Sequence, residues 1–413
     1  MSHNNSIKKL LNIKEDILQI INVEDENINN ITNKVIYATA TKDHSNCPCC
    51  SNKLVKNGSK IVNIKILKSC QYNSILRVKK QRYFCKNCNK SFLQELNFID
   101  KNCSISNDVK LAIKLELKEA KTIKSIAKEF NVSQSTVARI IDSFDDYKVN
   151  YNYLPEKLCF DEFKSTKDTK AAMSFVYCNA ENSEIIDVVE DRKLNSLREY
   201  FSRFTKEARN NVKHIVIDMY KPYIILTKEM FPNAKISIDR FHLIQLINRA
   251  FNKLRIIVMN KQDERMYNKL KKYWKLLLKN SCELSSKKEK RGKMFEYKYL
   301  SEEDIVKILI SCDKELEETY ELYQSFLITI KERKFKKFKE IVEDNYHKFK
   351  NLIKRSIRTF KKYLEYIENS LNYEYSNGRL EGINRKIKVL KYISYGYGSF
   401  VNFRKRILIC AII

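Results

Sequence analysis

The chain has 413 residues, which is long enough for several domains and for at least one large hydrophobic core. Hydrophobic residues make up 43% of it, so a chain that is disordered throughout is excluded. The formal net charge of +29 indicates a polyanionic partner, with nucleic acid favoured over an anionic membrane surface.

The N-terminal stretch and the cysteines indicate the compartment. MSHNNSIKKLLNIKEDILQI mixes acidic and polar residues into its apolar positions, unlike a signal peptide. The longest apolar run, ILICAII at residues 407–413, is far too short to span a membrane. Twelve cysteines without a secretion signal favour reduced thiols and metal ligands over disulfides. We therefore expect a cytoplasmic protein with no membrane partner.

Residues 1–100 combine β-like runs at 60–67 and 74–84 with two pairs of cysteines. CPCC and CKNC each have C-x-x-C spacing, and their ligand candidates are Cys47, Cys50, Cys85 and Cys88. Two such knuckles direct four thiolates at one point, as tetrahedral zinc requires. The spacing predicts a zinc ribbon in which structural Zn²⁺ supplies folding energy to a region with little core of its own. Buried cysteines or a redox pair are the alternative, and Cys49 or His44 could replace a neighbouring ligand.

Residues 104–147 have the pattern of short amphipathic helices. In TIKSIAKEFNVSQSTVARIID, Thr122 can cap a helix with apolar residues at 123, 126, 127 and 130. Ser133 can cap a second helix that buries apolar residues at 137, 140 and 141. This arrangement predicts a helix-turn-helix whose second helix reads DNA, and a plain helical hairpin is the alternative. The residues expected to face DNA are Gln134, Ser135, Thr136 and Arg139.

Residues 155–240 alternate β-rich runs with helical patterns. The expected strands lie in KLCFDEF, AAMSFVYCNA, SEIIDVVED, KHIVIDMY and AKISIDR, and the expected helices in NSLREYFSRF and PYIILTKEMF. This order predicts an α/β domain with a mixed sheet. From residue 241 to 372 the pattern is helical and rich in charge, with a loop at 280–300.

Three carboxylates stand in unusual contexts. Asp161 lies in an apolar run, and Asp218 ends another, where an ionised group is costly without a partner. The segment 373–413 contains the third. From Gly378 to Ile413 there are eight Lys and Arg but only one acid, Glu381, at the edge of the apolar face of an expected helix. Arg385 and Lys388 follow at i+4 and i+7, where they can hold phosphates.

Such a set of acids fits a specific chemistry. Three carboxylates can hold two Mg²⁺ or Mn²⁺ ions roughly 3.5–4 Å apart. One ion activates a water or a 3′-hydroxyl, and the other stabilises the leaving oxygen of a phosphodiester. Asp161, Asp218 and Glu381 are then both ligands and catalytic residues.

The motifs taken together resemble one family. CPCC…RYFCKNC, IAKEFNVSQSTVARI, FDEF, VIDMYKPY, SIDRFHLIQ and SNGRLEGINRKIK…YGSFVNFRKRI are similar to the ISL-three family of bacterial insertion-sequence transposases, over nearly all of residues 40–410. The resemblance implies a multidomain chain of the DDE class with an RNase H-like catalytic core. It implies that Asp161, Asp218 and Glu381 are the triad and that residues 241–372 are a helical insertion before the glutamate helix.

The resemblance also implies a function. We expect a transposase that binds the terminal inverted repeats of its element, frees 3′-hydroxyls and joins them to target DNA, as a homodimer or larger assembly close to the bacterial nucleoid. Asp239 and His242 in DRFH are expected beside the triad, with a helix N-cap and a packed histidine as alternatives. A non-catalytic DNA-binding regulator with a decayed core and a structure-specific nuclease are the competing functions.

Overall fold

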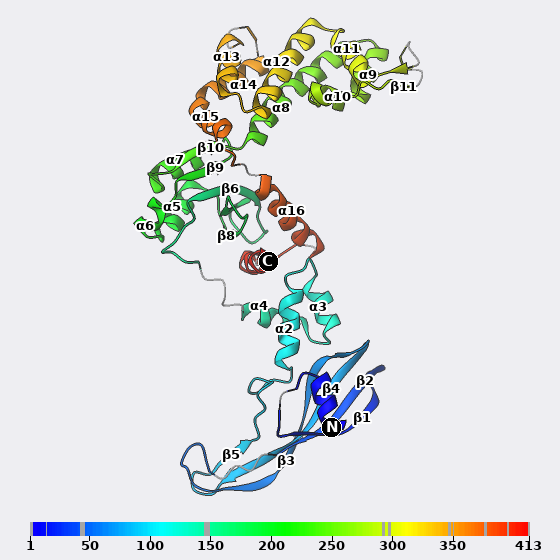
Figure 1. Ribbon diagram of the computed structural model, residues 1–413, viewed down its shortest axis with the longest axis vertical. Coiled ribbons are helices and arrows are strands. Elements are labelled where there is room, and N and C mark those ends of the chain that lie inside the picture. The colour runs from blue at the N-terminus through cyan, green and yellow to red at the C-terminus, as the bar shows by residue number, and fades with distance from the viewer. Residues whose placement is uncertain are drawn as a thin grey trace. The chain divides into compact units, whose positions relative to one another are not determined.

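In the computed structural model (Figure 1), the chain forms two compact units. It describes residues 3–413 except 14, 42–45, 144–148, 291–293, 296–298, 346–347, 350, 376–377, 395 and 412–413, and except the side chains of 3–5, 351, 379 and 381. The first unit comprises Met1–Lys148, Lys388–Tyr397 and Val401–Ile413, and the second comprises Val149–Ile387 and Gly398–Phe400. The segment 373–413 contributes residues to both units.

The first unit contains a five-stranded sheet in the order β1-β2-β4-β3, with β5 paired to β4. Its strands are β1 Leu18–Ile28, β2 Ile31–Ala40, β3 Leu54–Ser69, β4 Tyr72–Cys85 and β5 Lys90–Leu93. β2 and β4 run parallel, and the other neighbours run antiparallel. Alternate residues of β2 and β4, among them Ile36, Ala38, Leu76 and Val78, form a hydrophobic core. This core lies apart from the cysteine pairs, which have a small hydrophobic cluster of their own around Leu54 and Tyr83.

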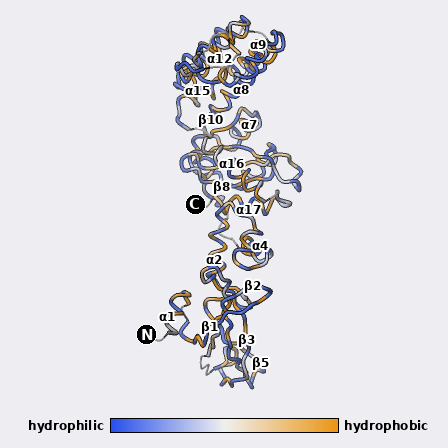
Figure 2. Tube along the Cα trace, turned by 90° about the vertical axis from the view of Figure 1, so that its right-hand side faces the viewer, coloured by the Kyte–Doolittle hydropathy of each residue, from blue (hydrophilic) through white to orange (hydrophobic). Residues whose placement is uncertain are grey.

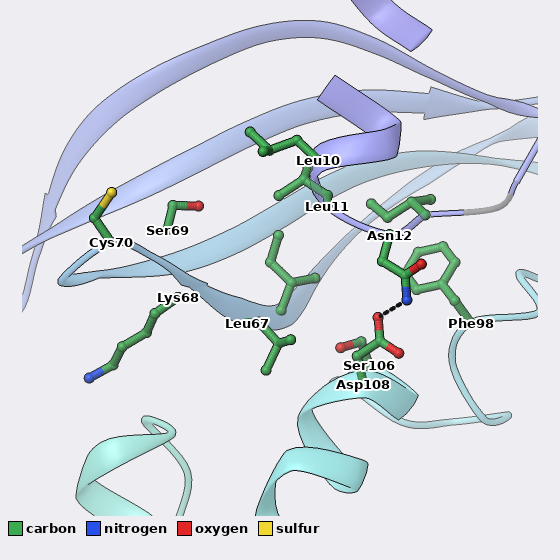
Figure 3. A pocket seen from close by; sticks show the side chains of 12 residues that line it. Leu10, Leu11, Asn12, Leu67, Lys68, Ser69, Cys70, Phe98, Ser106 and Asp108 are labelled. Carbon is green, nitrogen blue, oxygen red and sulfur yellow. Dashed lines mark hydrogen bonds between the residues drawn. The ribbon is translucent and has the colours of Figure 1, made fainter. Parts of the chain in front are cut away.

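Helix α1, His3–Leu10, lies beside this sheet and borders a pocket of about 340 Å³ (Figure 3). Its walls are mainly apolar, with Leu10, Leu11, Leu67 and Phe98 among the lining residues. Asn12 donates a hydrogen bond of 3.4 Å to Asp108 at its rim. The pocket is a gap between packed elements rather than a cluster of reactive groups.

Four helices of the first unit share a second hydrophobic core. They are α2 Asn107–Glu116, α3 Ile123–Glu129, α4 Gln134–Asp142 and α17 Phe400–Ala411. The core combines residues such as Val109, Ile126 and Val137 with Ile409 from the far end of the chain. Thr122 and Ser133 are N-caps, as predicted, because their hydroxyls accept from the backbone amides of Ser125 and Thr136.

The second unit is built on a five-stranded mixed sheet, as predicted, in the order β10-β9-β6-β7-β8. The strands are β6 Lys157–Lys164, β7 Met173–Asn179, β8 Ile185–Val189, β9 His214–Ile217 and β10 Lys235–Ile238. β6, β7 and β8 pair antiparallel, whereas β6, β9 and β10 pair parallel. The intervening helices are α5 Leu194–Ser202, α6 Lys206–Asn210 and α7 Lys221–Met230. Phe160 packs among Phe175, Phe201 and Phe231, which fixes β6 at the centre of the core.

The region after β10 is helical, as expected. Its helices are α8 Arg240–Met259, α9 Glu264–Lys272, α10 Trp274–Leu278, α11 Glu302–Ile310, α12 Lys314–Lys331, α13 Phe335–Asn345, α14 Asn351–Lys362 and α15 Leu364–Asn372. The expected loop contains a short 3₁₀ turn, Ser281–Glu283, and two short strands, β11 Glu289–Lys290 and β12 Tyr299–Leu300. α8 packs against α12 and α14, and α15 packs on β10. Hydrophobic and hydrophilic residues alternate along these helices, and no helix in the described part of the chain is long and apolar enough to cross a membrane (Figure 2).

Helix α16, Gly378–Ile393, follows the helical region. Its buried face contains Leu380, Ile387 and Leu390, as the sequence predicts, together with one polar residue, Asn384. Within the second unit the helix lies beside β6 (Figure 1). It is the element that brings the C-terminal part of the chain to the central sheet.

Candidate metal centres

The four predicted cysteine ligands form one cluster. Their sulfur atoms all lie within 4.8 Å of one another. Cys47 and Cys88 are 3.6 Å apart at Sγ, and Cys50 and Cys85 are 3.4 Å apart. Tetrahedral zinc with bonds of ~2.3 Å separates its sulfur ligands by about 3.8 Å, so the cluster fits that ion closely.

The pairing of β3 with β4 explains how the cluster forms. Leu54, just after the first knuckle, pairs with Cys85, which begins the second. Backbone N–H groups also point at the sulfurs, and the hydrogen bond from Asn52 is the largest cause that lowers the pKa of Cys50 to about 6. Burial, followed by the neighbouring cysteines, raises the pKa of Cys88 to about 12 in the same cluster, so the four thiols lose their protons as a group, and zinc would bind them as thiolates.

The two alternative zinc ligands are Cys49 and His44. Cys49 is exposed, and its sulfur lies 3.8 Å from the amino group of Lys90 rather than in the cluster. His44 lies outside the described residues. Within the described part of the chain, the ligand set is therefore the two C-x-x-C pairs.

Three aspartates line one edge of the second sheet. Strands β6, β9 and β10 run parallel, and Cys159 pairs with Val216 while Ile238 pairs with Ile217. Counting on from these pairs puts Asp161 level with Asp218, and Asp218 level with Asp239. Parallel strands end at the same edge of a sheet, which is where α/β proteins bind ligands. Asp218 and Asp239 each directly follow their strand.

His242 joins this row from the first turn of α8. Its Nδ1 lies 2.9 Å from Oδ1 of Asp218 and 3.2 Å from Oδ2 of Asp239. Asp239 occupies the N-cap position of α8, yet its side chain makes no capping hydrogen bond. One donor atom from each of these three residues falls within 4.8 Å of the others, which is close enough to share one ion. The expectation that Asp239 and His242 lie beside Asp218 agrees with this geometry.

The pKa values reflect crowded negative charge. Burial and then the charge of Asp218 raise the pKa of Asp161 to about 7. Burial likewise raises the pKa of Asp218. Burial lowers the pKa of His242, but hydrogen bonds and charge from Asp218 and Asp239 outweigh it and raise the pKa to about 10. The cluster therefore attracts a positive charge.

Helix α16 closes the other side of Asp161. Asn384 Nδ2 donates a hydrogen bond of 2.5 Å to Asp161 Oδ2. Glu381 stands one turn earlier in the same helix, but its side chain lies outside the described residues. The structure thus brings the helix that contains Glu381 to the strand that contains Asp161, and leaves the third carboxylate unplaced.

Two residues of this site, Asn384 and Glu162, were not predicted from the sequence. Asn384 is one of them; an amide within an amphipathic helix gives no sequence signal. The other is Glu162, which follows Asp161 in β6, so its side chain alternates to the other face of the sheet. It pairs with Arg192 and accepts a hydrogen bond of 3.1 Å from Tyr223. Arg192 also lies over the ring of Tyr220 at 4.8 Å, so Glu162 anchors a network next to the aspartates.

The predicted DNA-facing residues lie at helix surfaces. Gln134, Ser135 and Arg139 are exposed on α4, and Thr136 is half-buried. Thr136 and Ser133 share a hydrogen bond of 2.9 Å between their hydroxyls. Arg385 and Lys388 are exposed on α16.

Comparison with known proteins decides the family. A family model described as "Transposase", of the DDE type and the ISL3 group, matches residues 158–407, which is more than half of the chain. The chain belongs to the ISL3 family of transposases. A second model, described as the zinc-finger of transposase IS204/IS1001/IS1096/IS1165, matches residues 44–88 of this transposase and includes all four clustered cysteines. The N-terminal cysteine cluster is therefore a zinc ribbon.

Two named relatives match parts of this transposase. "Transposase for insertion sequence element IS1001" from Bordetella parapertussis is 24% identical over 221 residues, or 51% of this chain and 52% of that protein. A Lactococcus lactis subsp. lactis protein named "ATP-dependent protease" is 43% identical over 111 residues, or 27% of this chain and 36% of that protein. The chain thus spans between about a third and about half of the curated relatives it matches.

Proposed function

We propose that this transposase binds the terminal inverted repeats of its insertion sequence and catalyses metal-dependent DNA strand cleavage and strand transfer. The observation that carries the proposal is the row of Asp161, Asp218 and Asp239 at the carboxyl edge of the mixed sheet, with α16 packed against it. Acids at that edge of a mixed sheet also support an RNase H-like core. Asp161, Asp218 and Glu381 are the proposed catalytic residues.

The donor set fits divalent ions. Oδ1 of Asp218 is buried, and its partner among the described residues is the imidazole of His242, 2.9 Å away, which it shares with Asp239. An ionised oxygen left in that state is costly, and a cation removes the cost. Carboxylate oxygens are the ligands that Mg²⁺ and Mn²⁺ prefer.

The residues of the site would have separate roles in this reaction. Asp161, Asp218 and Glu381 would hold two ions, with Asp239 and His242 orienting Asp218. Bound ions would activate the attacking hydroxyl and stabilise the leaving oxygen of the phosphodiester. Exposed Arg385 and Lys388 would contact DNA phosphates and fix the position of the scissile strand.

End recognition is assigned to the first unit. We assign α3 and α4 to a helix-turn-helix, with Gln134, Ser135 and Arg139 exposed at the start of α4 for base and phosphate contacts. The zinc ribbon would add phosphate contacts, since the strands and turns around it are rich in lysine. Two element ends must be held together for transfer, so a dimer or larger assembly on DNA is expected.

The test uses the purified chain with Mg²⁺ and duplexes taken from the DNA that flanks its reading frame. Replacing Asp218 with Asn should lower the rate of strand cleavage at least about a hundredfold, because a direct metal ligand is lost. Band-shift affinity for the same duplexes should stay unchanged. Glu229→Gln, which removes only an exposed ion pair with Arg198, is the matched control.

Three outcomes separate the competing functions. Cleavage that survives in Asp218→Asn would reject the site. Binding without cleavage under both Mg²⁺ and Mn²⁺ would favour a regulator with a decayed core. Cleavage without joining to a target duplex would favour a nuclease.

A further inference from the structure

Among the α16 side chains that the structure describes, Asn384 is the polar one that lies within the buried face. It is 8% exposed and lies between Leu380 and Ile387, which are 0% and 2% exposed. An amide buried on an apolar face costs stability unless its hydrogen bonds are made. The group that the Asn384 amide hydrogen-bonds to therefore indicates why the amide is buried there.

The amide of Asn384 is oriented by chemistry. Nδ2 of Asn384 faces Oδ2 of Asp161 at 2.5 Å, and this is the end of the amide that a metal-binding carboxylate requires, because an ionised carboxylate only accepts hydrogen bonds. Oδ1 of Asp161 already accepts the backbone N–H of Glu162 at 2.7 Å. Both oxygens of Asp161 are thus held, one by its own strand and one by α16.

The carbonyl end of the amide differs from the NH₂ end. Oδ1 of Asn384 is buried and accepts no hydrogen bond among the described residues. Within one amide the oxygen and nitrogen are about 2.2 Å apart, which keeps this oxygen within about 5 Å of the Asp161 carboxylate. Oδ1 of Asn384 therefore lies in the same acidic cluster as Asp161 and accepts no hydrogen bond among the described residues.

We infer that Asn384 is a positioning residue of the carboxylate site: its NH₂ group fixes the Asp161 carboxylate for metal binding, and its free Oδ1 accepts from water coordinated to the ion. The inference rests on the proposed function, since it requires Asp161 to be a ligand. It accounts for a buried amide on an apolar face and for its unpartnered oxygen. Hydrogen bonds of this kind, which orient a ligand from outside, typically contribute ten- to a hundredfold to metal affinity.

The test measures metal binding without DNA. Mn²⁺ is titrated into the zinc-loaded full chain, and free Mn²⁺ is counted by electron paramagnetic resonance. Asn384→Ala should raise the Kd for Mn²⁺ at least about tenfold. Asn384→Leu, close to Asn in size and suited to an apolar face, should raise it equally while keeping the packing of α16.

Two further variants serve as controls for the measured Kd for Mn²⁺. Asn211→Ala removes another half-buried amide of the same unit, one that donates to the Leu154 carbonyl at 2.8 Å, and should leave the Kd unchanged. Asp161→Asn should abolish the same Mn²⁺ binding. If Asp161→Asn has no effect, the proposed metal site itself fails.

Another result would overturn the positioning role of Asn384 while leaving the proposed metal site intact. If Asp161→Asn removes binding but Asn384→Ala and Asn384→Leu keep the wild-type Kd, Asn384 does not position the carboxylate. Loss of folding in both Asn384 variants would also overturn the inference, because it would make the amide a structural residue.

Discussion

His214 is a buried histidine outside the metal cluster. It is 4% exposed, and its Nε2 lies 2.8 Å from the hydroxyl of Ser237. The rings of Tyr373 and Tyr375 pack on it at 4.9 and 5.0 Å. Burial, followed by the charges of Lys235 and Lys157, lowers the pKa of His214 to about 4.

This pKa predicts a loss of stability in mild acid. The unfolded chain binds a proton to this imidazole near pH 6.5 and the folded chain near pH 4, so unfolding takes up a proton between them. The free energy of unfolding of the wild type should fall, relative to His214→Gln, by up to about 1.4 kcal/mol per pH unit across that window. Urea unfolding from pH 7 to 5, followed by Trp274 fluorescence, measures it.

The comparison with the variant is essential because other groups titrate in the same range. The raised pKa values of Asp161 and Asp218 favour the folded state as pH falls, and they are present in both proteins. Equal pH slopes for wild type and His214→Gln would contradict a buried neutral histidine.

The metal-site residues differ in how far the sequence predicts them. Asp161 and Asp218 stand out because an acid within an apolar strand, or directly after one, is unusual, and strand register then brings them level. Asn384 carries no such signal, because whether a single amide contributes to the site depends on which strand α16 packs against. Helix packing over more than two hundred residues of separation decides that contact.

At the scale of elements, α17 is tied to α2 by one buried arginine. Arg406 is 1% exposed, and its guanidinium donates to the carbonyls of Leu117, Glu119 and Lys121. Leu117 is the C-cap of α2, and Glu119 and Lys121 lie in the segment after it, where backbone carbonyls have no partner within the helix. Arg406 therefore satisfies them in place of water.

Arg406→Ala should destabilise the first unit by about 3 kcal/mol, since buried carbonyls lose a charged donor. Lys405→Ala, next to it in α17, loses an ion pair with Asp142 in which the side chains are 35% and 59% exposed, and should cost less than about 1 kcal/mol. Urea unfolding followed by far-ultraviolet circular dichroism reports both units, while Trp274 reports only the second. A shift of the Trp274 transition in Arg406→Ala, or equal costs for both variants, would contradict this role.

The elements that sequence reasoning missed have physical reasons. The strands of the second sheet match the predicted runs because their apolar residues are continuous and turn residues bound them. β1 is largely exposed and lacks a clear alternation, so it gives a weak strand signal. The charges of α17 resemble a phosphate-binding face, yet Arg406 is buried, because its partners come from a helix far away in the chain.

At the scale of the whole molecule, stability is divided among separate cores. In the described residues, the sheet, the helices and the zinc ribbon of the first unit each have their own hydrophobic cluster. The second unit has one large cluster that runs from the sheet into the helical region. Separate cores allow separate unfolding transitions, so a single melting temperature is not expected.

Zinc should stabilise one of these parts and not the other. The ribbon cluster is small, so metal bonds supply most of its folding free energy, whereas the second unit contains none of the four cysteines. Stripping Zn²⁺ with a chelator, or replacing Cys50 with Ser, should lower a melting transition seen by circular dichroism and leave the Trp274 transition in place. Cys49→Ser is the control, because that exposed thiol lies outside the cluster. If Cys49→Ser destabilised the chain as much as Cys50→Ser, the ligand assignment would be wrong; if zinc removal shifted the Trp274 transition equally, the two units would not unfold independently.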